Sequence, residues 1–109
     1  MKVKLNIQFD DSRYVGDDSE PTRMRVGNIK SLKKAINGLG LREAKEFVES
    51  CTRDLDKDYS EWSKPRSVIF TAEQWGTLTL LRVTDQCAFH FSEVTILEDD
   101  DDVVDFSRE

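Results

Sequence analysis

Residues 37–49 read NGLGLREAKEFVE, and this stretch says more about the fold than any other part of the chain. Glycine has no Cβ and readily adopts the left-handed conformation that commonly ends a helix, so Gly38 predicts the end of one helix. Gly40 then permits a tight reversal into a second helix over 41–51. Because this connection is so short, the two helices are expected to pack side by side as an αα-hairpin.

The helix before the turn is predicted over residues 29–37, with Asn28 as its N-cap. Ile29, Leu32 and Ile36 recur at the spacing of one buried helical face. The second helix is expected to bury an apolar stripe and to expose its charged residues. That stripe consists of Leu41, Ala44, Phe47, Val48 and Cys51.

Basic side chains gather on this hairpin, although the whole chain has a net charge of −6. Residues 23–45 carry seven basic side chains against the single acidic Glu43. Such a charge asymmetry acts on association, and the acidic surroundings argue against direct nucleic-acid binding. A surface that docks a protein partner is therefore predicted, and the other interpretation is an ordinary solvated helix face. The predicted partner-binding residues are Lys30, Lys33, Lys34, Gly38, Leu39, Gly40, Arg42 and Lys45.

The remaining chain predicts strands on both sides of the hairpin. Apolar residues alternate over residues 3–9, which is typical of an antiparallel strand with one buried face. Residues 10–22 are expected to form a long acidic loop, and residues 52–66 an extended excursion without a regular element. A short buried strand is predicted at residues 68–70.

The C-terminal part contains a helix signal that a rival interpretation contests. Thr71 and Gln74 match the capping box, which predicts a helix from Ala72. The rival is a strand at 77–83, since this segment is rich in residues that disfavour helix. The apolar parity changes within residues 89–97, which predicts either a strand with a bulge near Ser92 and Glu93 or a strand that starts only at Glu93.

Length and composition indicate one small domain over residues 1–97, followed by an acidic tail over 98–109 that is predicted to be disordered. No apolar run approaches the roughly 18 residues of a membrane span, so a cytoplasmic protein is the default expectation. Cys51 and Cys87 are expected to be small buried residues rather than a disulfide or a metal site.

The sequence contains a few other candidate site residues. Residues 54–58 imitate the opening of a calcium loop, but Tyr59 replaces the required glycine, and no metal or cofactor site is predicted. His90 has no companion histidine and no identifiable nucleophile, so catalysis is not expected. Trp75 is expected to anchor the third helix, and Trp62 to be available as an interface anchor.

The run over residues 34–49 resembles the C-terminal domain of the bacterial large-subunit ribosomal stalk protein. In that family a Gly-Leu-Gly-Leu-Lys-Glu-Ala-Lys segment joins two helices in the same way. The resemblance implies an α+β fold in the order β-α-α-β-α-β, with a three-stranded antiparallel sheet and three helices on one face. It also implies recruitment of translation GTPases, with Lys34, Arg42 and Lys45 at matching basic positions.

The resemblance has limits along the chain. The family's N-terminal dimerisation domain and hinge have no counterpart in this sequence, and the loops at 10–27 and 52–66 are longer than in the family. The adaptor of the Clp protease has a similar fold and recognises protein N-termini, but no residues here match its pocket.

The favoured function is a non-enzymatic protein-interaction module that docks a translation- or proteolysis-related partner through the basic hairpin. The alternative is an acidic inhibitor or nucleic-acid mimic, including one of viral origin, that binds a DNA- or RNA-binding protein. It would act through its acidic loops and tail. The acidic residues of the tail are Glu98, Asp99, Asp100, Asp101 and Asp102.

Overall fold

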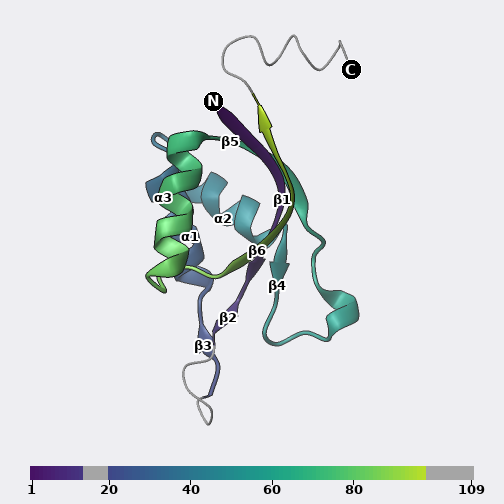
Figure 1. Cartoon of the computed structure of the whole chain (residues 1–109). Helices are drawn as coiled ribbons and strands as arrows, with labels where there is room; N and C mark the ends of the chain where they lie inside the picture. The colour runs from purple at the N-terminus through teal and green to yellow at the C-terminus, as the bar shows by residue number, and fades with distance from the viewer. Residues whose placement is uncertain (14–19, 98–109) are drawn as a thin grey trace.

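The computed structural model describes residues 1–13 and 20–97. It is an α+β fold in which three helices lie on one side of a mixed β-sheet (Figure 1). The described elements are β1 (Lys2–Asp10), β2 (Ser12–Arg13), β3 (Thr22–Arg23), α1 (Arg25–Ala35), α2 (Leu41–Glu49), β4 (Thr52–Arg53), the short 3-10 helix η1 (Tyr59–Glu61), β5 (Arg66–Thr71), α3 (Ala72–Val83) and β6 (Phe89–Leu97).

The first strand of the chain, β1, is the centre of the sheet. It pairs antiparallel with β5 along one edge and antiparallel with β6 along the other. β4 adds a short parallel pairing, in which Phe9 and Asp10 of β1 lie opposite Thr52 and Arg53. The expected three-stranded antiparallel sheet is therefore wrong in this respect, because the chain leaving α2 runs briefly alongside β1 in the same direction.

The predicted bulge in the last strand is confirmed. Between the pairs Asn6–Ser92 and Lys4–Thr95, β6 has two residues where β1 has one. Glu93 sits in this extra position with a φ of 55°. An inserted residue reverses the parity of the side chains that follow it. This explains why the apolar residues of β6 change from odd to even numbers.

The core lies between the helices and one face of β1. The odd-numbered residues of β1, from Val3 to Phe9, are at most 3% exposed. Helical and sheet residues pack on them as one cluster: Ile29, Leu32, Ala35, Ala44, Val48, Cys51, Phe70, Leu78, Leu81, Cys87 and Phe89. Trp75 packs on this cluster and stacks on Phe70, as expected for an anchor of α3. None of the described helices is long and apolar enough to cross a membrane.

The first helix begins earlier than the sequence predicts. α1 starts at Arg25, and Asn28 lies fully buried inside it rather than at its N-cap. The Asn28 amide nitrogen donates to the carbonyl of Asp10 at 3.0 Å, and its oxygen accepts from the amide of Ala88 at 2.8 Å. The expected N-cap is wrong because this side chain satisfies backbone groups at the ends of two strands.

The prediction for α3 is confirmed, and the prediction for α2 is wrong at one residue of its apolar stripe. α3 starts at Ala72, and Thr71 and Gln74 form the reciprocal cap, with Thr71 Oγ1 accepting from the Gln74 amide at 3.0 Å. The helix interpretation of residues 72–83 is confirmed. In α2, Ala44 and Val48 are buried as predicted, but Leu41 is 60% exposed because it occupies the first position of the helix.

The two long loops contain more structure than expected. Residues 12–13 and 22–23 pair as the β2–β3 hairpin, and residues 52–66 contain β4 and η1. The prediction that these segments lack regular elements is wrong. The strand pairings in these segments are only two residues long, which is too short to leave a periodic pattern in the sequence.

Candidate functional site

The turn between α1 and α2 has the geometry that its glycines require. Gly38 has a φ of 89°, in the left-handed region that side chains with a Cβ rarely adopt. Gly40 is the N-cap of α2, and its amide donates to Glu43 Oε2 at 3.1 Å. The helix itself ends at Ala35, so Gly38 lies in the turn and not at the last helical residues.

The predicted basic residues occupy exposed faces of these two helices. Lys30, Lys33 and Lys34 lie on α1 at spacings of three and four residues, where helical side chains are neighbours. Lys45 lies exposed on α2, and none of these four lysines forms an ion pair with any residue in the described part of the chain. Their ammonium groups are available to a partner.

Arg42 differs from the lysines because it has a local partner. Its Nε lies 3.3 Å from Glu46 Oε1, one turn further along α2, and both side chains are largely exposed. An exposed pair of this kind contributes at most about 0.5 kcal/mol to the helix and exchanges readily with other partners. Arg42 is therefore the weakest of the predicted basic contacts.

An apolar pocket of about 290 Å³ lies between α1, the turn, α2 and β5. Leu39 of the turn lines it, and none of the predicted basic residues does. The pocket residues are Leu32, Ile36, Leu39, Glu43, Phe47, Val68 and Phe70. The sequence marked Leu39 only as part of the turn, whereas the structure makes it a pocket wall.

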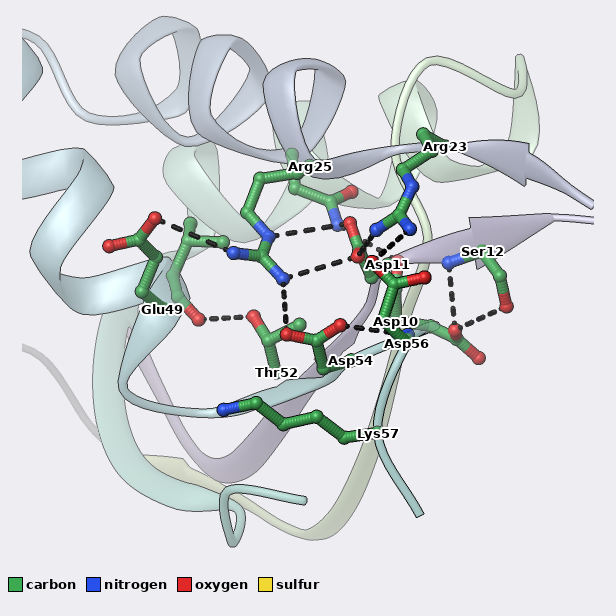
Figure 2. Close-up of polar contacts among 12 residues, drawn as sticks. Asp10, Asp11, Ser12, Arg23, Arg25, Glu49, Thr52, Asp54, Asp56 and Lys57 are labelled. Carbon is green, nitrogen blue, oxygen red and sulfur yellow. Dashed lines mark hydrogen bonds and ion pairs between the residues drawn. The ribbon is translucent and has the colours of Figure 1, made fainter. Parts of the chain in front are cut away.

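A second charged region, which sequence reasoning missed, surrounds Asp11 (Figure 2). Asp11 is fully buried, and its carboxylate accepts from Arg23 at 2.9 Å and from Arg25 at 3.1 and 3.3 Å. Its carbonyl accepts from the amide of Met24 at 2.9 Å. These contacts fasten the start of α1 to the end of β1.

The same arginines reach the loop after β4. Arg25 lies 3.1 Å from Asp54 and 3.5 Å from Glu49, and Arg23 pairs with Asp56. The Asp56 amide donates to Asp54 at 2.9 Å, and this bond, together with Arg25, holds the pKa of the Asp54 carboxyl below its usual value. Two of the residues that imitated a calcium loop are thus counter-ions of arginines.

This region changes the meaning of the charge count. Arg23 and Arg25 contributed to the excess of basic residues in 23–45, but carboxylates from three segments neutralise them. Within residues 23–45, the cations without a carboxylate partner among the described residues are therefore Lys30, Lys33, Lys34 and Lys45. Spacing along the sequence could not reveal these pairs, because their partners lie up to 33 residues away.

The remaining candidate residues have clear positions. His90 Nε2 lies 3.2 Å from Asp10 Oδ2. Trp62 is half-buried rather than exposed, and its indole nitrogen donates to the carbonyls of Asp54 and Lys57. Burial raises the pKa of the Cys51 and Cys87 thiols, which keeps them protonated near neutral pH. The acidic tail, Glu98 to Asp102 included, lies outside the described residues.

Comparison with known proteins gives one informative similarity. No protein-family model and no solved structure matches the chain. A 43-residue segment is 44% identical to the large ribosomal subunit protein bL12 of Treponema denticola. The segment covers 39% of this chain, which spans about a third of the length of that relative. The similarity supports a segment like that of the ribosomal stalk protein.

Proposed function

We propose that this chain is a protein-interaction module that docks an acidic protein partner through the α1–α2 hairpin. One observation carries the proposal: within the described residues, Lys30, Lys33, Lys34 and Lys45 have no carboxylate partner, whereas Arg23 and Arg25 are neutralised. Exposed positive charges on adjacent helices attract a negatively charged protein surface and accelerate its association.

The apolar pocket beside the turn supplies a second element of recognition. Interfaces obtain most of their affinity from a few apolar or aromatic anchors in desolvated pockets, with charged residues at the rim. The pocket next to Leu39 has room for one such side chain. The partner we propose therefore presents a large apolar residue together with acidic residues.

The similarity to bL12, a large ribosomal subunit protein, favours a partner from the translation machinery. A translation GTPase is the partner class that the stalk resemblance implies, and it would place the chain in the cytoplasm. Binding rather than catalysis is proposed, because both thiols are buried with raised pKa values. Buried protonated thiols are poor nucleophiles.

The proposal is tested by calorimetric titration of the protein with a purified bacterial translation GTPase in its GTP form. Wild type is compared with the double charge reversal Lys34→Glu and Lys45→Glu. We expect the reversal to weaken binding at least tenfold, with little change in thermal stability. Because the contact is electrostatic, raising the salt concentration should weaken wild-type binding and leave the variant less affected.

Two controls complete the design. Lys57→Glu reverses one exposed lysine outside the hairpin, which is half the charge change of the double variant, and should leave binding unchanged. Truncation after Leu97 removes the acidic tail. If truncation abolishes binding while the hairpin reversal does not, the acidic-inhibitor alternative replaces this proposal. Equal affinity of wild type and reversal would also overturn it.

A further inference from the structure

The loop between β4 and β5, with η1, lies on the side of the sheet away from the helices (Figure 1). Gln8, on that face of β1, connects the two: its amide donates to the carbonyl of Ser63 at 2.8 Å. Two adjoining hollows result, of about 400 and about 220 Å³, and both are lined by Gln8, Arg53 and Pro65. The larger is within the usual size of small-molecule sites.

Arg53 is held rigidly between these hollows. Its Nε donates to Gln8 Oε1 at 2.7 Å, and its guanidinium carbon lies 5.3 Å from the centre of the Trp62 ring. Its two terminal nitrogens make no hydrogen bond to any residue that the structure describes. A planar fork that is fixed at Nε and free at both ends suits bidentate binding of a phosphate.

Aromatic rings stand beside this fork in the larger hollow. The rings of Tyr59 and Trp62 have centroids 5.1 Å apart, and Tyr59 is 81% exposed. Trp62 is fixed by the two carbonyls that its indole nitrogen contacts. An exposed ring next to a cation is the usual platform on which a nucleobase stacks.

The side chains that line the two hollows include cations but no carboxylate. The linings contain Arg53, Lys64 and His90 but no carboxylate, in a chain of net charge −6. Carboxylates adjoin the linings without belonging to them: Asp10 contacts His90, Glu93 contacts the amide of Asn6, and Asp58 and Glu61 are sequence neighbours of Tyr59 and Trp62, so the attraction for an anion rests on Arg53 and Lys64. The hollows therefore favour an anion.

We propose that this face binds a mononucleotide, with its phosphate on Arg53 and Lys64 and its base stacked on Tyr59. A phosphate monoester carries nearly two negative charges at neutral pH, which two cations match. A long nucleic acid would meet the repulsion of the acidic molecule, whereas one phosphate requires only local cations. The site shares no residue with the α1–α2 hairpin, so nucleotide binding can be tested independently of the docking function.

The test is titration of the full chain with AMP, adenosine and inorganic phosphate, followed by amide chemical shifts and calorimetry. AMP is expected to bind with a Kd on the order of 0.1 mM, and adenosine and phosphate at least tenfold more weakly. Amides of residues 53, 59 and 62–64 should shift. Absence of shifts with AMP, or equal affinity for AMP and phosphate, would overturn the proposal.

Variants assign the two halves of the site. Arg53→Lys keeps the positive charge but removes the planar guanidinium. Lys64→Gln removes the charge of an exposed side chain and should leave the fold intact. Each variant should lower the affinity for AMP at least fivefold. Tyr59→Ala should weaken AMP fivefold or more without changing the affinity for phosphate. Lys45→Gln, on the hairpin, should have no effect. If a penta-aspartate peptide shifts the same amides with the affinity of AMP, the surface is an acidic-peptide site and the nucleotide assignment is wrong.

Discussion

Two basic regions of this molecule behave in opposite ways. Arg23 and Arg25, at the start of α1, are surrounded by carboxylates, one of them the fully buried Asp11. The lysines of the hairpin, three further along α1 and Lys45 on α2, have no ion-pair partner within the described residues. The first region holds the fold together and the second is available for binding. A positive charge indicates a binding surface only when the fold has not already neutralised it.

The strongest test of this comparison is Asp11→Asn. The substitution leaves two arginines without their buried counter-ion, and breaking such a pair costs about 3 kcal/mol. The free energy of unfolding, measured by urea denaturation, should fall by about that amount. Asp56→Asn removes an exposed partner of Arg23 and should cost less than about 1 kcal/mol. If the free energy of unfolding falls by less than about 1 kcal/mol in both variants, Asp11 does not hold the two arginines in place.

The turn of the hairpin should respond more moderately. Gly38→Ala places a Cβ at a φ of 89°, in open space, so the cost comes from the backbone alone and should be about 1–2 kcal/mol. Gly76→Ala is the matched control, because it lies inside α3 and its Cβ also meets nothing within 4 Å. It should stabilise the protein by about 0.5–1 kcal/mol. If Gly76→Ala lowered the free energy of unfolding as much as Gly38→Ala, the cost at Gly38 could not be assigned to its positive φ.

A smaller effect is expected in the acid dependence of stability. The pKa of Asp54 is lowered from 3.8, first by the Asp56 amide and then by Arg25. A carboxyl with a lowered folded pKa stabilises the protein above its unfolded pKa, and this contribution is lost as the pH falls through the folded value. The free energy of unfolding should therefore drop less steeply below pH 4 in Asp54→Asn than in wild type. Identical slopes in an acid titration would exclude this role.

The smallest effect should come from the hairpin lysines themselves. The double variant Lys33→Gln and Lys34→Gln removes two exposed charges that have no partner among the described residues. Its free energy of unfolding should stay within about 0.5 kcal/mol of wild type. A loss above 1 kcal/mol would mean that the lysines support the fold, and the contrast with Arg23 and Arg25 would disappear.

Local signals explain what the sequence could predict. The cap at Thr71, the glycine turn and the parity change before Val94 each act within a few residues, and the structure agrees with all three. The failures involve distant partners. Asn28 resembles an N-cap locally, but it bonds to Asp10 and Ala88, which only the folded sheet brings near.

The candidate sites show the same difference between local signals and contacts among distant segments. The exposed lysines of the hairpin were predictable, because charged positions opposite an apolar stripe must face solvent. The pocket at Leu39 and the Asp11 network were not, since each joins residues from several elements. The fork of Arg53 was also unpredictable: its neighbours Gln8 and Trp62 lie on a strand and on a loop with no sequence pattern in common.

The central position of β1 has a consequence for biosynthesis. β1 is synthesised before the other described elements, but its longest ladder is with β6, the last described element. Apart from the short β4 pairing at Phe9 and Asp10, both of its edges stay unpaired until residues 66–97 have been synthesised, and an open apolar strand is prone to associate with other chains. The nascent chain therefore cannot complete its sheet before β6 has been synthesised, and slower elongation lengthens the period during which β1 needs protection by chaperones.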